Sequence, residues 1–360
     1  MPLELDRKEM NEIKTDVCVI GGGSGGLSVA AGAVQMGASV VLLEANLMGG
    51  DCLNYGCVPS KALIAAAKHA HNMQSGAEFG VTPVKPTIHY SAVKDHVRKV
   101  IDTIAPVDSQ ERFEKLGVTV IREFGRFISA TEVQAGDTII KARRFVIATG
   151  SSPLVPPIPG LKDIPYFTNE TIFELRNQPE HLLVVGGGPI GMEMAQAHAR
   201  LGSKVTVVEG MKALGKDDPE LASVVLDRMR DEGVEIAENA MAREIRKKAG
   251  KIEIEVEDGR VFKGTHLLMA VGRKANINDL GLEAAGVAFD RSIQVDAGMR
   301  TTNKKVYAIG DVSGNLQFTH VAGYHAGIII SRCYLACLPS QESTTSRGRH
   351  IRTQSWRRSA

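Results

Sequence analysis

The chain has 360 residues, of which 43% are hydrophobic and 23% charged, a composition typical of a soluble globular protein with about two or three domains. Its formal net charge of +2 gives no reason to expect nucleic acid or a membrane surface as a partner, and no apolar run is long enough for a membrane-spanning helix. Because residues 1–16 are charged and lack the apolar core of a signal peptide, we expect a cytoplasmic protein. In that compartment a disulfide is more often catalytic than structural.

The first part of the chain predicts a strand, a glycine-rich turn, a helix and a second strand, over residues 15–20, 21–26, 27–36 and 39–43. The turn contains a G-x-G-x-x-G motif at Gly21, Gly23 and Gly26, and the second strand ends at Glu44. Such glycines let the backbone approach a pyrophosphate, the helix N-terminus attracts its charge, and the acid accepts hydrogen bonds from ribose hydroxyls. The motif alone is weak, but this complete order predicts a dinucleotide-binding unit.

Cys52 and Cys57 follow this unit, and the four residues between them match neither a zinc site nor a thioredoxin-like motif. On a regular helix their Cα atoms would lie about 8.7 Å apart, whereas a disulfide needs about 4.4–6.8 Å. A bonded pair therefore requires a break in the helix, which Asn54 and Gly56 permit. A helix start near Pro59 would lower the pKa of a thiol there. From spacing alone, two ordinary buried thiols remain the simpler interpretation.

The dinucleotide-binding pattern occurs a second time, with matching positions such as Glu44 and Glu209 separated by 165 residues. It predicts a strand, a glycine-rich turn, a helix ending at Leu201 and a second strand, with the strands over residues 181–185 and 204–208. The motif glycines are Gly186, Gly188 and Gly191. Two such units suggest two dinucleotides held at once, the arrangement needed to pass a hydride from a nicotinamide to a flavin.

The segments between and after these units predict helices and small sheets. Helices are expected over 62–74 and over 91–116 with an interruption at Pro106. Residues 118–149 and 235–272 each predict a small antiparallel sheet that returns to the parallel one. The proline-rich run 153–159 suits a connection between domains.

The thirteen residues 49–61, GGDCLNYGCVPSK, resemble the redox-active disulfide segment of the class I flavin-dependent pyridine nucleotide-disulfide oxidoreductases. This family includes dihydrolipoamide dehydrogenase, glutathione reductase and mercuric reductase, and only Asp51 and Tyr55 are unusual for it. Residues 306–311 resemble its second flavin-binding signature. The resemblance implies an α/β fold with two Rossmann-like FAD/NAD(P)-binding domains, each with a three-layer parallel sheet and a small antiparallel meander. The expected FAD domain combines residues 1–152 and 275–330, and the NAD domain covers 153–274.

The resemblance also implies which residues bind the cofactors. Expected FAD contacts are Gly21, Gly23, Gly26, Glu44, Gly50, Lys61, Gly125, Thr149, Gly150 and Asp311. Expected NAD contacts are Gly186, Gly188, Gly191, Glu209 and Gly272. Because the carboxylate of Glu209 would repel a 2′-phosphate, NADH is expected in preference to NADPH, although Lys212 and Lys216 lie close in sequence. No resident metal site is expected.

In the implied reaction, NADH reduces the flavin, which then opens a Cys52–Cys57 disulfide. Cys57 would be the flavin-side thiolate and Cys52 the thiol that attacks the substrate. Lys61 and Glu193 would form an ion pair beside the flavin with the lysine buried; the alternative is that Lys61 is a surface lysine in the first turn of a helix. The substrate is expected to be a small or protein-bound disulfide, as for dihydrolipoamide dehydrogenase, or Hg(II), since soft thiolates bind both. Tyr55 replaces an expected small apolar residue and leaves this choice open.

The C-terminal part departs from the family pattern. Family members continue into a domain that forms a homodimer and supplies a His-Glu acid-base pair, whereas recognisable sequence here ends near Ile330. Residues 331–360 contain six arginines and one acidic residue, and we expect an aberrant, disordered tail in which Cys333 and Cys337 are incidental. The alternative function is then a nucleotide-binding remnant with diaphorase activity only. His320 and His325 are not assigned a catalytic role.

Overall fold

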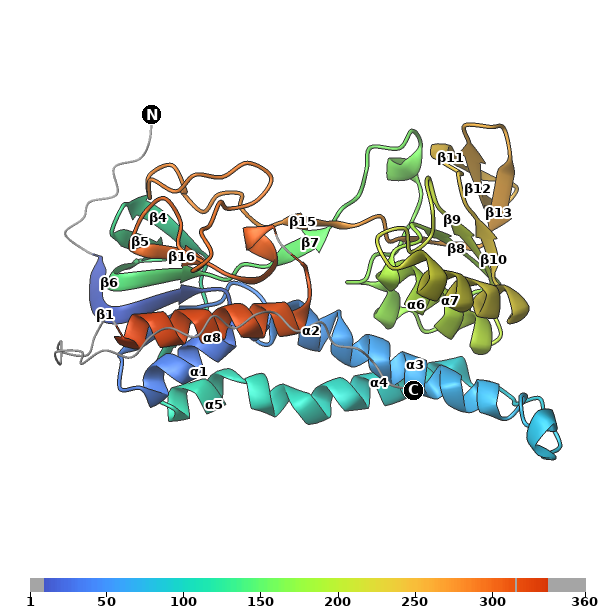
Figure 1. The fold of residues 1–360 in the computed structure, drawn as a ribbon, viewed down its shortest axis with the longest axis horizontal. Coiled ribbons are helices and arrows are strands. Elements are labelled where there is room, and N and C mark those ends of the chain that lie inside the picture. Colours follow the sequence, from blue (N-terminus) through green and yellow to red (C-terminus); the bar gives the residue numbers. More distant parts are fainter. Residues whose placement is uncertain (1–9, 315, 336–360) are drawn as a thin grey trace.

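The computed structural model describes residues 10–314 and 316–335, which form two α/β units connected by long helices (Figure 1). The helices are α1 (Ser24–Gln35), α2 (Gly50–Asn54), α3 (Cys57–Asn72), α4 (Tyr90–Ile104), α5 (Gln110–Lys115), α6 (Pro189–Arg200), α7 (Pro219–Asp231) and α8 (Thr319–Leu335). Short 3₁₀ helices are η2 (Ala77–Phe79), η3 (Ala105–Asp108), η4 (Leu161–Asp163), η5 (Ile172–Glu174) and η6 (Gly310–Ser313).

The first unit is built on a mostly parallel sheet in the order β3-β2-β1-β6, with β16 also parallel to β6 and with β5 and β4 continuing antiparallel. Its strands are β1 (Asn11–Ile20), β2 (Val40–Leu43), β3 (Val118–Ile121), β4 (Gly125–Ser129), β5 (Glu132–Ala135), β6 (Thr138–Ile147) and β16 (Val306–Ala308). Helices α1, α5 and α8 cover one face, where Val19, Phe113 and Ile329 share a buried core. The meander and the segment around Leu280 cover the other face. The unit therefore has three layers.

The second unit repeats this arrangement with a parallel sheet in the order β10-β9-β8-β14. Its strands are β8 (His181–Val185), β9 (Lys204–Val208), β10 (Glu235–Ala237) and β14 (His266–Met269), and a separate antiparallel sheet contains β11 (Ala242–Lys248), β12 (Lys251–Val256) and β13 (Val261–Gly264). Leu183 and Ile254 share the core between the two sheets, while Met192 of α6 packs on the opposite face. The predicted α/β class with two Rossmann-like, three-layer units is confirmed.

Two details of the predicted tails are wrong. We expected antiparallel sheets to begin at Val118 and Glu235, but β3 and β10 pair parallel with β2 and β9 and extend the main sheets. The reason is the helical connection that precedes each of these strands. Such a crossover carries the chain back along the sheet, so that the next strand runs parallel to its neighbour. The antiparallel meanders begin only at the following strands.

The two units are joined by a two-stranded ribbon of β7 (Ser151–Pro153) and β15 (Arg273–Ala275), seen in the middle of Figure 1. The proposed domain boundaries at 152/153 and 274/275 fall within the strands of this ribbon and stay a prediction. Helices α3 and α4 extend from the first unit and pack on the second, since Leu63 and Leu182 belong to one buried core.

At the C-terminus, α8 continues to Leu335, so the helix runs five residues into the segment 331–360 in which no helix was expected. The side chain of Cys333 and all of residues 336–360, including Cys337, lie outside the described part. Across the part that is described, none of the helices combines the length and apolar content needed to span a bilayer.

Candidate active site

The first glycine-rich turn is fixed by close backbone approaches. Gly21 has φ +111°, and a Cβ atom there would lie 2.4 Å from the carbonyl oxygen of Ala148. A Cβ atom at Gly26 would lie 1.9 Å from the carbonyl oxygen of Gly21, so only glycine lets α1 pack this close to the turn. The backbone N–H of Gly22 donates to Oε2 of Glu44 at 2.6 Å, which joins the turn to the end of β2.

The second turn has the same geometry. Gly186 also has φ +111°, and its Cβ atom would lie 2.4 Å from the carbonyl oxygen of Ala270. At Gly191 a Cβ atom would lie 2.1 Å from the carbonyl oxygen of Gly186, and the N–H of Gly187 donates to Oε2 of Glu209 at 2.6 Å. The sequence repeat is therefore a repeat of backbone conformation and hydrogen bonding.

Each turn leaves open space where a phosphate could bind. A Cβ atom at Gly188, Gly150 or Gly272 would meet nothing within 4 Å, and at Gly23 the nearest atom would be 3.8 Å away. Among the residues that the structure describes, no side chain caps α1 or α6, which begin directly after Gly23 and Gly188, so the first amide N–H groups of these helices are available to a ligand. Both cradles therefore fit the pyrophosphate of a dinucleotide.

The other expected cofactor residues lie around the first cradle. Thr149 Oγ1 donates a hydrogen bond to the backbone carbonyl oxygen of Asn276 at 2.7 Å, and Asn276 Nδ2 donates to the backbone carbonyl oxygen of Thr149 at 2.9 Å. Asp311 accepts a hydrogen bond from Ser151 Oγ. Gly125 is a packing residue, since a Cβ atom there would lie 2.5 Å from Leu43 Cδ1. Its contact with a cofactor stays a prediction, as does the contact of Glu44 with ribose.

The cysteine segment packs directly on the first cradle. The N–H of Gly49 donates to the carbonyl oxygen of Gly22 at 2.9 Å, and a Cβ atom at Gly50 would lie 2.7 Å from Gly23 Cα. The chain leaves the helical conformation at Tyr55 and at Gly56, which has φ −121° and ψ −115°. The expected break thus occurs at Gly56, while Asn54 remains the last residue of α2.

Helix α3 begins at Cys57, two residues before the start expected at Pro59. Both Cys52 and Cys57 are free thiols, so the pair is in its reduced form. The pKa of Cys57 is lowered to about 5, first because Cys52 donates a hydrogen bond to its sulfur and further by Thr319 and the charge of Lys61, against an opposing effect of burial. The same hydrogen bond and burial raise the pKa of Cys52. These opposite shifts favour a thiolate at Cys57 and a thiol at Cys52.

Lys61 and Glu193 form the expected ion pair, which links α3 to α6. Lys61 Nζ donates to both carboxylate oxygens, at 2.8 and 2.6 Å. The expectation of a buried lysine is wrong in this structure, because its side chain is 60% exposed and that of Glu193 40%. The lysine instead lies one turn after Cys57 on the solvent-facing side of α3, where its charge still reaches the thiolate.

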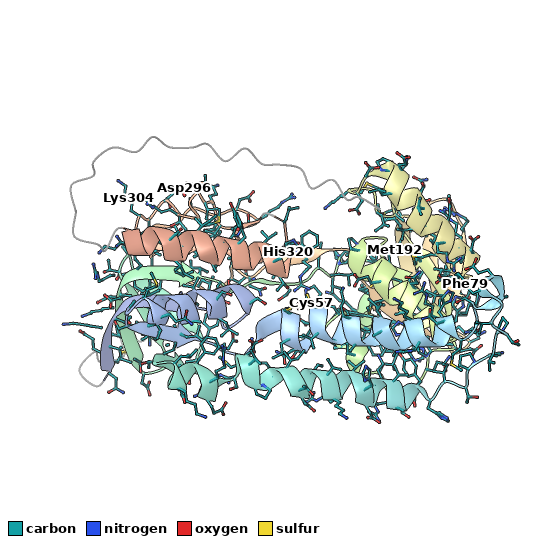
Figure 2. The ribbon with its side chains drawn as sticks, turned by 60° about the horizontal axis from the view of Figure 1, so that its bottom comes forward. Cys57, Phe79, Met192, Asp296, Lys304 and His320 are labelled. Carbon is teal, nitrogen blue, oxygen red and sulfur yellow. The ribbon has the colours of Figure 1, made fainter. Side chains whose placement is uncertain are left out.

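Sequence reasoning missed Thr319 as a part of this site. Its Oγ1 lies 3.3 Å from Cys57 Sγ, at the first residue of α8. His320 follows at the start of the same helix, beside the start of α3 (Figure 2), and stacks on Phe318 with ring centroids 5.4 Å apart. His325 is buried, and its Nδ1 accepts a hydrogen bond from the N–H of Gly310 at 3.2 Å, a structural role. The only available signal was that Thr319 follows the expected flavin-binding signature at residues 306–311.

Two nucleotide cradles, one of them beside a cysteine pair, are typical of the flavin- and nicotinamide-dependent oxidoreductases. A family model described as pyridine nucleotide-disulphide oxidoreductase matches residues 15–326, and the chain belongs to this family, as segment 49–61 predicted.

Among its relatives, mercuric reductases from Streptomyces lividans and Acidithiobacillus ferrooxidans are 33% and 36% identical, over 87% and 85% of this chain. A dihydrolipoyl dehydrogenase of Chlamydia trachomatis is 34% identical over 90% of the chain. The solved structure of the HOCl-induced flavoprotein disulfide reductase RclA from Escherichia coli superimposes with a TM-score of 0.79 at 28% identity, over 88% of this chain and 70% of RclA. The chain spans 69% and 57% of the two mercuric reductases and 70% of the dehydrogenase.

Proposed function

We propose that the chain transfers electrons from NADH through FAD to Cys52 and Cys57, which then reduce a disulfide or another thiol-reactive substrate. One observation carries this proposal: the segment with Cys52 and Cys57 lies directly on a nucleotide cradle, through the contacts of Gly49 and Gly50 with Gly22 and Gly23. FAD would occupy the cradle of Gly23 and Gly150, and NADH the equivalent cradle of the second unit. When bound, the flavin supplies a two-electron carrier between nicotinamide and sulfur.

The division of charge within the pair suits thiol-disulfide exchange. The Cys57 thiolate accepts the proton of Cys52, and the resulting Cys52 thiolate attacks one sulfur of a substrate disulfide and displaces the other as a thiolate. Cys57 then passes the proton that it took from Cys52 to the released substrate thiolate. The Cys57 thiolate attacks the Cys52 sulfur, and the second substrate thiolate leaves and takes a proton from solvent. The substrate gains two electrons and two protons, and the cysteines end as a disulfide.

NADH is proposed in preference to NADPH because of Glu209. Its carboxylate is held at the end of β9 by the N–H groups of Gly187 and Met211, at 2.6 and 2.8 Å. A negative charge fixed there accepts hydrogen bonds from ribose hydroxyls and repels a 2′-phosphate. The expected cytoplasmic location stays a prediction.

Hg(II) reduction is the second candidate, favoured by the mercuric reductases among the relatives. Thiolates are soft ligands, and the exposed Cys57 with its neighbour Cys52 could hold one soft ion. Comparing NADH consumption with Hg(II), lipoamide and a protein disulfide would assign the substrate.

The proposal is tested by anaerobic titration of the FAD-loaded chain with NADH, followed by absorbance. We expect a long-wavelength band from the thiolate beside the flavin, absent in Cys57→Ser and retained in the control Cys18→Ala, whose sulfur is buried in the first unit. Flavin bleaching without this band in the unmodified chain would leave only the diaphorase alternative. A chain that binds no FAD would contradict the proposal entirely.

A further inference from the structure

Asp51, one of the two residues that are unusual for the family, is held by the second unit. Its Oδ1 lies 3.0 Å from Arg273 Nη2 and accepts a hydrogen bond from Asn169 Nδ2 at 3.0 Å. Asn169 Nδ2 also donates to the carbonyl oxygen of Tyr55 at 3.2 Å. Arg273 begins β15, just after β14, and Asn169 follows Phe167, which pairs with β14. One edge of the second unit therefore holds both ends of the peptide that contains Cys52.

Arg273 is in turn fixed to the first unit. Its side chain is only 9% exposed, and its guanidinium donates to Ser151 Oγ at 2.7 Å and to the Ser151 carbonyl oxygen at 2.8 Å. Its Nε also lies 3.8 Å from Asp311 Oδ2. A planar group with this many partners has a defined position, so its charge cannot follow Asp51 if that carboxylate moves.

The carboxylate of Asp51 also lies close to the residue before Cys57. A Cβ atom at Gly56 would be 3.0 Å from Asp51 Oδ2, so glycine at this position allows the approach. Asp51 therefore acts on Cys57 as a nearby negative charge and raises its pKa, whereas Lys61 lowers it.

The other groups that face Cys57 are Cys52 of α2 and the uncharged Thr319 of α8. Asp51 itself faces Arg273, Asn169 and Glu170, and the pKa of Glu170 is raised by its burial and by Asp51.

We propose that Asp51 and Arg273 act together as positioning residues, which fasten the cysteine helix α2 to the domain junction and set the thiolate fraction of Cys57. Arg273 neutralises a carboxylate that would otherwise destabilise the thiolate. The inference rests on the proposed function in that it takes Cys57 as the functional thiolate. The Asp51–Arg273 pair differs from a purely structural ion pair in one respect: loss of the Asp51 charge should lower the pKa of Cys57, whereas loss of the Arg273 charge should raise it.

The test is the pH profile of Cys57 alkylation by iodoacetamide in the reduced chain between pH 4 and 8, with the modified cysteine located by fragment-ion mass spectrometry. Asp51→Asn removes the negative charge and should lower the midpoint of this pH profile by about half to one pH unit. At a pH below the midpoint, Cys57 should then be alkylated about three- to tenfold faster than in the parent. Arg273→Gln leaves Asp51 unneutralised and should raise the midpoint by a similar amount. The double variant should return towards the parent, and Arg273→Lys should stay near it.

A matched control is the exposed pair of Arg176 and Asp95, which also joins the second unit to α4 but does not involve the cysteine segment. Arg176→Gln and Asp95→Asn should leave the midpoint unchanged. Shifts of the same sign in Asp51→Asn and Arg273→Gln, or no shift in either, would overturn the proposal. If Arg273→Gln does not fold, an unchanged or raised midpoint in Asp51→Asn overturns it equally.

Alkylation needs neither NADH nor a flavin, so its outcome is separate from the proposed function. Opposite shifts without any NADH-dependent absorbance band would support the role of Asp51 and Arg273 and contradict the electron transfer. An absorbance band without opposite shifts would do the reverse.

Discussion

Replacing Gly188 by alanine separates nucleotide binding from folding in the second unit. The residue has φ −76° and ψ 176°, a conformation open to alanine, and its Cβ atom would meet nothing within 4 Å. Stability should therefore be unchanged or raised by about 0.4–1 kcal/mol, because alanine restricts the unfolded chain. The new methyl group, however, enters the space assigned to the pyrophosphate, where overpacking costs about 1–3 kcal/mol. NADH should then bind about 5- to 150-fold more weakly.

Calorimetric titration with NADH and thermal unfolding of the same sample measure both quantities. Gly191→Ala is the matched comparison, because its Cβ atom would lie 2.1 Å from the carbonyl oxygen of Gly186 and should lower the melting temperature as well. FAD content should be normal in Gly188→Ala, since the first cradle is untouched. Unaltered NADH affinity in Gly188→Ala would refute the placement of the pyrophosphate at this turn.

Three further predictions concern charges at the site. Because the pKa of Cys57 is lowered to about 5, its rate of alkylation should be constant well above that pH and fall about tenfold per pH unit below it. Thr319→Val should raise the midpoint of this pH profile, and Thr319→Ser should restore it. Glu209→Ala should improve NADPH binding relative to NADH severalfold, measured as the ratio of dissociation constants, and an unchanged ratio would contradict the proposed preference. Lys61→Met should raise the midpoint of Cys57 alkylation. It should change the free energy of unfolding by less than about 1 kcal/mol, because the ion pair with Glu193 is largely exposed. A larger loss of stability would contradict the assignment of this ion pair to the surface.

The nucleotide cradles could be predicted from sequence because their physics is local. A turn that brings two backbone segments within contact requires glycine at fixed positions, and the same requirement occurs at Gly21 and Gly186 with the same φ of +111°. The acid at the end of the second strand belongs to the same short unit. Because these residues must stand at fixed distances along the chain, the repeat of the motif after 165 residues can be recognised from the sequence alone.

The surroundings of the cysteines could not be predicted in this way. Cys57 and Thr319 are separated by 262 positions, and no periodicity connects them. The contact between Asp51 and Arg273 likewise exists only because the ribbon of β7 and β15 places the start of β15 beside α2. Even the pair of Lys61 and Glu193 was expected from family resemblance and not from its own neighbourhood in sequence.

Two ion pairs of opposite polarity therefore join the cysteine segment to the second unit. Asp51 is negative and pairs with Arg273, whereas Lys61 is positive and pairs with Glu193. Asp51 raises the pKa of Cys57 and Lys61 lowers it. Because opposite charges offset each other at a distance, each partner should reduce the effect of the residue it binds. The loss of both pairs at once would unmask two opposing charges. The thiolate fraction of Cys57 should then change less than after the loss of either pair alone, because the effects of Asp51 and Lys61 have opposite signs.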